Sequence, residues 1–232
     1  MKRMIDKVRR TCEKTAFLKR VQQNAHYSEE DLPLLWDVMS QILASMDENA
    51  FVSDRQVVYT SAYEQIRKDA SLSDDIWENG LLHEVVITLG GHADEIQEKY
   101  MQEGKLTEAY MVEVIGSEIL LKAYSEYNTW VKQNTEYAVE RYLFPNKDLA
   151  MIPEILERSG LPVMCTEAFC MIPKKSVAFL AVWTKDKSCL CEGVCMGCGR
   201  KDCPNRMNDG QKTHQKLPDR PLTYGQTKIF GL

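Results

Sequence analysis

Five of the eight cysteines of this chain lie close together near its C-terminal end. The last three of the five have the spacing C-x2-C-x4-C, and glycines between and beside them allow a tight turn of the backbone. Thiolates at such spacing can converge on one metal, and four of them hold either an iron–sulfur cluster or a structural zinc ion. The sequence therefore predicts a metal-binding loop formed by Cys189, Cys191, Cys195, Cys198 and Cys203.

Three of the expected metal ligands are Cys195, Cys198 and Cys203. For the fourth ligand we expect Cys191, because the nearer thiol closes a small loop with less strain, and Cys189 is the alternative. A 4Fe-4S cluster is the expected group and zinc is the alternative. A tail of free or disulfide-bonded thiols is the third interpretation, although clustered thiols in a reducing compartment usually share a ligand.

The composition is that of a soluble globular protein, with 44% apolar and 27% charged residues among 232. A net charge of -5 argues against nucleic-acid binding, which usually requires a basic surface. No apolar stretch approaches the roughly 20 residues of a membrane span, and the first residues lack the apolar core of a secretory signal. We therefore expect a cytoplasmic protein without a membrane partner, in which cysteines bind metal more often than they form disulfides. The three cysteines outside the cluster are expected to be buried: Cys12, Cys165 and Cys170.

Apolar periodicity predicts several helices and strands. Residues 28–31 resemble a capping box with Asp31 in the place of the usual Glu or Gln. The pair Gly116-Ser117 lies inside the longest helical pattern, where either a close packing contact or a tolerated glycine explains it. The helical patterns cover residues 5–21, 34–46, 94–101, 106–131 and 152–158, and the strand patterns cover 57–59, 81–89, 137–144, 163–172 and 177–183.

The order of these elements, helices first and then strands mixed with helices, predicts an α+β fold with an antiparallel or mixed sheet. Residues 81–89 are expected to form a buried central strand. The last two strands are expected to form a hairpin across Pro173, Lys174 and Lys175. We expect an α+β domain over residues 1–184 and a cysteine-rich metal-binding segment with its tail over residues 185–232. No motif indicates acid–base or nucleophilic catalysis, and the histidines are expected to be surface or hydrogen-bonded residues.

Several ordered motifs give the chain a resemblance to a known family. Thr166-Glu167-Ala168-Phe169 is followed by Pro173 and by Ser176-Val177. Upstream lie Thr88-Leu89-Gly90 and Ile115-Gly116-Ser117. Over roughly residues 30–184, this set resembles the activation domain of cobalamin-dependent methionine synthase. The ending Cys203-Pro204-Asn205-Arg206 is similar to that of stand-alone members from anaerobic bacteria.

The resemblance implies a C-shaped domain with a curved sheet and long helices, which docks over a corrinoid cofactor held by a partner protein. In the full enzyme such a domain binds S-adenosylmethionine, and oxidised cobalamin is reduced and remethylated. The family's S-adenosylmethionine loop reads Arg-x-x-Pro-Gly-Tyr. Here Arg141 matches, but the proline follows one residue late as Pro145, and Asn146 stands where the glycine is expected. Arg141 is therefore the one candidate contact to S-adenosylmethionine, whose binding the altered loop disfavours.

From these patterns we expect an accessory protein that reactivates a cobalamin-dependent methyltransferase of the methionine synthase type. It would dock on the corrinoid and supply an electron through its iron–sulfur cluster. One alternative is an activation domain that uses S-adenosylmethionine as the methyl donor. A second alternative is a zinc-stabilised docking module without redox chemistry. No catalytic residue is assigned in any of these interpretations.

Overall fold

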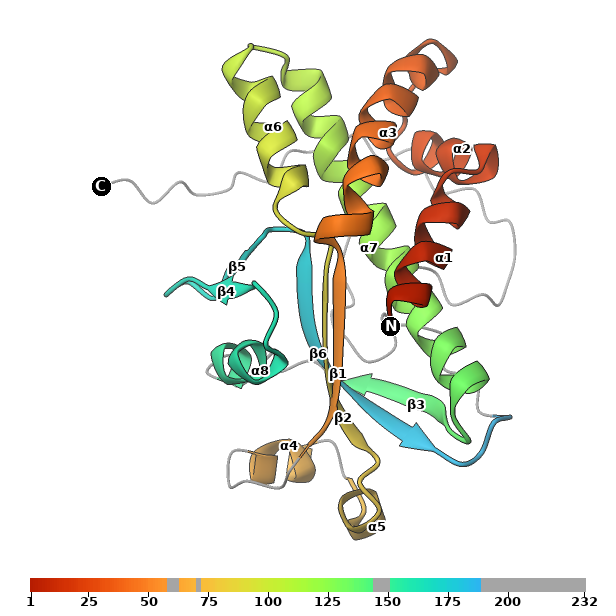
Figure 1. Ribbon diagram of the computed structural model, residues 1–232, viewed down its shortest axis with the longest axis vertical. Coiled ribbons are helices and arrows are strands. Elements are labelled where there is room, and N and C mark those ends of the chain that lie inside the picture. The colour runs from red at the N-terminus through yellow and green to blue at the C-terminus, as the bar shows by residue number, and fades with distance from the viewer. Residues whose placement is uncertain (58–62, 70–71, 144–150, 189–232) are drawn as a thin grey trace.

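The computed structural model describes residues 1–57, 63–69, 72–143 and 151–188, which form an α+β fold (Figure 1). The helices are α1 (Lys2–Cys12), α2 (Thr15–Asn24), α3 (Leu32–Asn49), α4 (Glu64–Asp69), α5 (Asp74–Glu78), α6 (His92–Gln102), α7 (Leu106–Asn134) and α8 (Met151–Ser159), with a 3-10 turn at Glu29–Asp31. The strands are β1 (Phe51–Gln56), β2 (Leu82–Thr88), β3 (Ala138–Leu143), β4 (Met164–Cys165), β5 (Met171–Ile172) and β6 (Ser176–Thr184).

The main sheet has the strand order β1-β2-β6-β3, and all its neighbouring strands are antiparallel. Of the two sheet types expected from the sequence, the antiparallel one is therefore confirmed. Strands β2 and β6 lie in the centre, paired from Leu82 opposite Val182 to Thr88 opposite Ser176. The expected buried central strand is β2, in which Val85, Val86 and Ile87 are 1% exposed or less.

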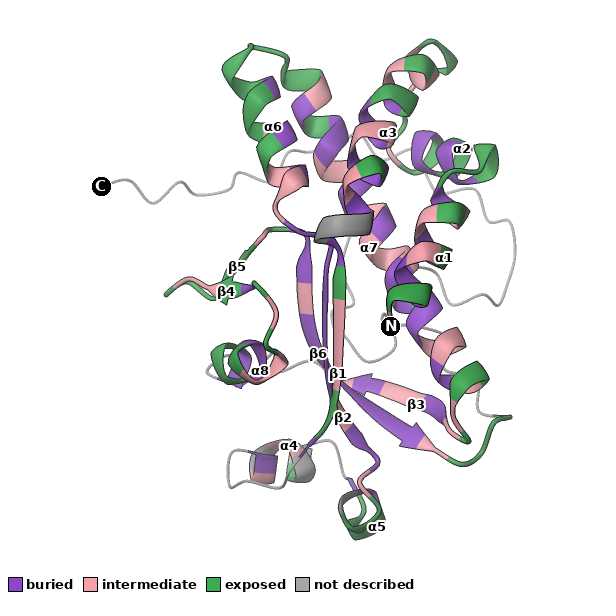
Figure 2. Ribbon diagram, viewed as in Figure 1, coloured by how far each residue is buried: buried purple, intermediate pink, exposed green. Residues whose placement is uncertain are grey.

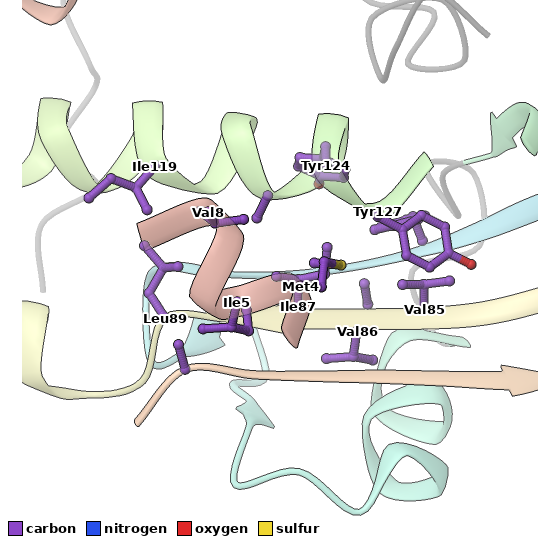
Figure 3. Close-up of a cluster of buried hydrophobic side chains, with 14 of the residues drawn as sticks. Met4, Ile5, Val8, Val85, Val86, Ile87, Leu89, Ile119, Tyr124 and Tyr127 are labelled. Carbon is purple, nitrogen blue, oxygen red and sulfur yellow. The ribbon is translucent and has the colours of Figure 1, made fainter. Parts of the chain in front are cut away.

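The two faces of the sheet carry different covers. Val85 and Ile87 point toward the helical layer, where Met4 and Ile5 of α1 lie between α7 and β2 (Figure 3). Because side chains alternate along a strand, Glu84 points the other way and contacts Arg158 of α8. Helix α8 and the small β4–β5 ribbon thus cover the face opposite α1 and α7 (Figure 1). Both central strands are consequently buried along most of their length (Figure 2).

The expected hairpin between residues 163–172 and 177–183 is wrong. The first segment folds back on itself, so that β4 pairs with β5 as a separate two-stranded sheet. Its turn is closed by the Cys170 backbone N–H, which donates to Thr166 Oγ1 at 3.1 Å, and by the Thr166 N–H, which donates to the Cys170 carbonyl at 2.9 Å. Strand β6 instead pairs with β2 on one edge and, from Leu180 to Thr184, with β3 on the other.

Two N-terminal expectations change in detail, and one is confirmed. The helical pattern over residues 5–21 is two helices, because the chain leaves helical geometry at Lys14. The strand expected near residue 57 lies earlier, at β1, and residues 58–62 are outside the described part of the chain. The capping box is present, with the Ser28 backbone N–H donating to Asp31 Oδ2 at 2.8 Å ahead of α3. Among the described helices, none combines the length and apolarity needed to cross a bilayer.

Candidate functional site

Three of the motif segments meet at one end of the main sheet, where β2 ends and β6 begins. Thr88 and Ser176 stand opposite each other, and the Ser176 hydroxyl donates to Thr88 Oγ1 at 2.8 Å. The Gly90 backbone N–H donates to the same oxygen at 3.0 Å. The Leu89 N–H donates to the Lys175 carbonyl at 2.9 Å, which ties the segment before β6 to the end of β2. We call the Lys175 side chain and its two partners on α7 (Leu106–Asn134) the Lys175 cluster: Glu113, Ser117 and Lys175.

The side chain of Lys175 connects the sheet to the long helix α7. It is only 7% exposed, and it lies across Gly116. A Cβ atom at Gly116 would stand 3.0 Å from Lys175 Cε and 3.1 Å from Cδ and Cγ, closer than most side-chain contacts. Of the two explanations for this glycine, the structure thus supports a close packing contact, with a lysine stem rather than with another helix or the sheet backbone.

The ammonium group of Lys175 ends between two side chains of α7. It pairs with Glu113 Oε1 and donates to Ser117 Oγ at 3.2 Å. The Glu113 side chain is 45% exposed, so water solvates the carboxylate while the ammonium is enclosed. A half-exposed pair of this kind contributes little to stability but fixes the position of the lysine. The Pro173–Ser176 segment is therefore held against α7 at a defined depth.

A second lysine fixes the same segment to helix α6. The Lys174 backbone N–H donates to Asp94 Oδ2 at 2.8 Å, and its Nζ donates to Gln97 Oε1 at 3.0 Å. Asp94 lies in the first turn of α6, where the helix dipole favours a carboxylate. Two consecutive lysines thus join the start of β6 to two different helices. The sequence offered a signal for this arrangement, a Lys-Lys pair directly before a strand, but gave no partner for either residue.

The Thr166–Phe169 motif lies outside the Lys175 cluster. It forms the turn of the β4–β5 ribbon, and Phe169 adopts a positive φ of 59° with 38% of its surface exposed. Met164 and Ile172 are paired across the ribbon and are 65% and 46% exposed, so one face of the ribbon presents apolar side chains to solvent. Cys165 and Met171 form the neighbouring pair and pack against the core. The motif is therefore a projecting feature rather than part of the buried cluster.

Arg141 is not brought to the Lys175 cluster. It lies on β3 opposite Val182, beside a bulge, toward the other end of β6. Its side chain is 39% exposed and forms an ion pair with Glu140, with 3.5 Å between Arg141 Nε and Glu140 Oε1. Arg141 Nε is buried and has no hydrogen-bond partner within the described residues. Residues 144–150, including Pro145 and Asn146, lie outside the described part of the chain.

The expected metal ligands Cys191, Cys195, Cys198 and Cys203, and the alternative Cys189, also lie outside the described residues, so these assignments remain predictions. In the described ranges, no group of three or more His, Cys, Asp or Glu side chains is placed to hold a metal ion. The other cysteines differ in burial: Cys12 is buried, Cys165 is partly buried and Cys170 is exposed.

The expectation that all three isolated cysteines are buried holds fully only for Cys12. Burial in the interface of α1 raises the pKa of the Cys12 thiol to about 12, despite the opposing fields of Lys122 and Arg20. Cys170 is exposed because it belongs to the ribbon turn rather than to a sheet strand.

No protein-family model matches the chain, and no curated protein sequence matches it at a significant level.

Proposed function

We propose that this protein is a reactivation accessory of a cobalamin-dependent methyltransferase of the methionine synthase type. It docks on a corrinoid protein or corrinoid methyltransferase and supplies an electron through an iron–sulfur cluster held by its C-terminal cysteines. In this proposal, residues 1–184 form a domain that resembles the activation domain of methionine synthase, and residues 185–232 form a metal-binding segment. The system to which it belongs is cobalamin-dependent methyl transfer in methionine biosynthesis.

The observation that supports the resemblance is the meeting of three motif segments at one place. Thr88–Gly90, Gly116-Ser117 and Pro173–Ser176 are far apart in sequence, yet their atoms make direct hydrogen bonds or van der Waals contacts. Motifs that match a family by chance have no reason to lie together in space. Their contact gives the ordered set of short matches a shared structural role, the joining of the sheet end to α7.

The donor set of the C-terminal segment fits an iron–sulfur cluster. Four thiolates are the usual ligands of a cubane cluster, and the sequence supplies them as Cys191, Cys195, Cys198 and Cys203. When bound, such a cluster supplies an electron at low potential, and protein-bound clusters reach about −700 mV. Cobalt(II) in a corrinoid must gain a low-potential electron before it can be methylated again. The proposed metal group and the proposed partner therefore require the same chemistry.

The first experiment is metal and sulfide analysis with electron paramagnetic resonance on protein purified without oxygen. A cubane cluster gives about four irons and four sulfides for each chain. One zinc ion without sulfide would replace the electron-transfer proposal by the zinc-stabilised docking module.

The second experiment tests the electron-transfer step. The variant Cys198→Ser is compared with Cys170→Ser, which removes an exposed thiol outside the cluster. We expect Cys198→Ser to abolish reductive reactivation of a cobalt(II) corrinoid protein and Cys170→Ser to leave it unchanged. Normal reactivation by Cys198→Ser would contradict the proposal.

One observation favours the S-adenosylmethionine-using alternative. Arg141 Nε is buried and pairs with the Glu140 carboxylate at 3.5 Å, but it makes no hydrogen bond among the described residues. A ligand carboxylate beside β3 would satisfy it. Calorimetric titration with S-adenosylmethionine tests this alternative, with Arg141→Lys as the variant. Binding that weakens in Arg141→Lys supports a methyl-donor site, and absence of binding removes it.

A further inference from the structure

The helix-facing side of the sheet carries a second group of polar side chains, at the end away from Lys175. It consists of Asp54 on β1, His83 on β2, Tyr127 on α7 and Trp183 on β6, and we call it the Asp54 network. Asp54 Oδ1 lies 2.6 Å from His83 Nδ1, and the Tyr127 hydroxyl donates to Asp54 Oδ2 at 3.1 Å. Because a carboxylate only accepts, the imidazole proton must be on Nδ1. Both oxygens of a single carboxylate are thus occupied by different elements of the fold.

The indole of Trp183 completes the network. Its Nε1–H donates to the Tyr127 hydroxyl at 3.3 Å. Its ring stacks on the imidazole of His83, with 3.6 Å between the ring centroids and 8° between the planes. Trp183 therefore touches the tyrosine through its N–H and the histidine through its face, and the four side chains form one connected unit.

The network is almost completely enclosed. Tyr127 is 0% exposed, Trp183 is 8% exposed, and the Asp54 side chain is 6% exposed. The His83 side chain, at 13%, is the most accessible of the four. Within the described residues, its Nε2 has no hydrogen-bond partner. The aromatic core and the carboxylate are thus shielded from bulk water. Of the four residues, His83 is the most accessible to that water.

The phenol of Tyr127 holds its proton firmly. Burial, and after it the neighbouring Asp54 carboxylate, raise the pKa of Tyr127 well above its usual value. Simple loss of the proton is therefore disfavoured at any working pH. A buried phenol can nevertheless give up an electron if its proton moves to a base at the same time, and Asp54 already accepts a hydrogen bond from it.

We propose that Tyr127 is a redox-active tyrosine that reduces an oxidised Trp183 and passes its proton to Asp54. The activity is separate from the proposed corrinoid reactivation. The reaction begins when a one-electron oxidant, of the class of oxygen-derived radicals, removes an electron from the Trp183 indole near the protein surface. It ends with the unpaired electron on a buried phenol.

The step balances in atoms, electrons and charge. The indole radical cation of Trp183 gains one electron and becomes the neutral indole. Tyr127 loses that electron while its O–H bond breaks, leaving the neutral tyrosyl radical, and a new O–H bond forms at Asp54 Oδ2. A cation and an anion are replaced by neutral groups, which a poorly solvated site favours. His83 is a positioning residue, since its Nδ1–H holds Asp54 Oδ1 and leaves Oδ2 toward the phenol.

The same aromatic cluster contains a matched tyrosine for comparison. Tyr142 is 1% exposed, and its ring centroid lies 5.2 Å from that of Phe179, as the Tyr127 centroid lies 5.8 Å from Phe179. The Tyr142 hydroxyl donates at 3.4 Å to the Tyr124 backbone carbonyl, which is not a base. If burial and aromatic contact alone produced a stable radical, Tyr142 would form it as readily as Tyr127.

The test uses the full chain and a photogenerated ruthenium(III) complex as the oxidant. Flash photolysis follows the conversion of the indole radical to a tyrosyl radical, and freeze-quenched samples are examined by electron paramagnetic resonance. We expect the unmodified protein and Tyr142→Phe to give the tyrosyl signal. Tyr127→Phe loses most of it and prolongs the indole radical.

Asp54→Asn keeps the side-chain shape but removes the base. It should slow the conversion and remove the solvent deuterium isotope effect, which a purely structural carboxylate would not do. An equal tyrosyl yield in Tyr127→Phe and Tyr142→Phe would overturn the proposal, and so would an unchanged conversion rate in Asp54→Asn. Near-ultraviolet circular dichroism confirms that each variant retains its aromatic packing before the photolysis.

Discussion

At the Ser176 end of β6, the enclosed ammonium of Lys175 pairs with a carboxylate that is 45% exposed, whereas at the Trp183 end the Asp54 carboxylate is only 6% exposed. The first pair keeps contact with water through Glu113, so loss of the lysine leaves the carboxylate solvated. The Asp54 carboxylate is not solvated in this way, and it is the acceptor for two donors inside the fold. Two polar clusters on the same side of one sheet therefore depend on their partners to different degrees.

The largest effect is expected from Asp54→Ala. The change leaves the His83 Nδ1–H and the Tyr127 hydroxyl without their acceptor, and each buried unsatisfied donor costs about 1–3 kcal/mol. Urea unfolding should show the free energy of unfolding falling by the sum of the two. Asp54→Asn, which retains one acceptor oxygen, is the control and should lose less. Equal losses in the two variants would show that only the volume of the side chain matters.

An intermediate effect is expected from Gly116→Val. The new side chain occupies the path of the Lys175 stem, and overpacking of this kind costs about 1–3 kcal/mol. In the background Lys175→Ala the path is vacant, so the same change should cost less. Unfolding of the two single variants and the double variant gives the coupling energy directly. Additive losses would mean that Lys175 moves aside freely and does not fix the distance between sheet and helix.

A smaller effect is expected from Lys175→Met. The substitution keeps most of the stem that packs on Gly116 and removes the charge, while water continues to solvate Glu113. The free energy of unfolding should change by less than about 1 kcal/mol, as for other partly exposed ion pairs. A loss as large as that of Asp54→Ala would erase the proposed difference between the two ends of the sheet.

The smallest effect concerns thiol reactivity. With a pKa of about 12, the Cys12 thiol is ionised at pH 8 to about one part in ten thousand, and it is fully buried. Peptide mapping after alkylation should find Cys170 modified and Cys12 intact in the native protein. Asp54→Ala should raise Cys12 alkylation more than Lys175→Met does, since α1 packs on α7, which carries Tyr127. Equal rates of Cys12 alkylation in the two variants would show that loss of the Asp54 network does not loosen the packing around Cys12.

The long, strongly patterned elements of the fold could be predicted from the sequence, and they include α3, α7, α8, β2 and β3. The pairing of residues 163–172 could not be predicted in this way. Local patterns at residues 163–172 were compatible with one strand, but the segment folds back so that β4 pairs with β5, and β6 takes its partners from residues 82–88 and 138–143. Strand pairing over such distances is decided by competition among distant segments, which a single sequence does not display.

The two polar clusters also differ in how much of each could be predicted from the sequence. Motif matching pointed to the segments of the Lys175 cluster, although not to the contact between Lys175 and Glu113, which are 62 residues apart. The Asp54 network had no motif, and His83 was expected only to be exposed or hydrogen-bonded. Its contacting pairs are 29 to 100 residues apart in sequence and meet only because strand register and one helix face coincide. A site of this kind becomes visible only in three dimensions.

The position of β6 has a consequence for biosynthesis. Strand β2 is complete at Thr88, but its partner begins only at Ser176, 88 residues later. At a synthesis rate of about 5–20 residues per second, the ribosome takes roughly 4–18 s to make the intervening chain. During that time the valine-rich β2 has only β1 to pair with, and one of its edges stays open to other nascent chains. The central strand of the finished sheet is thus an edge strand in the unfinished one, and an open edge is a template for pairing with another chain.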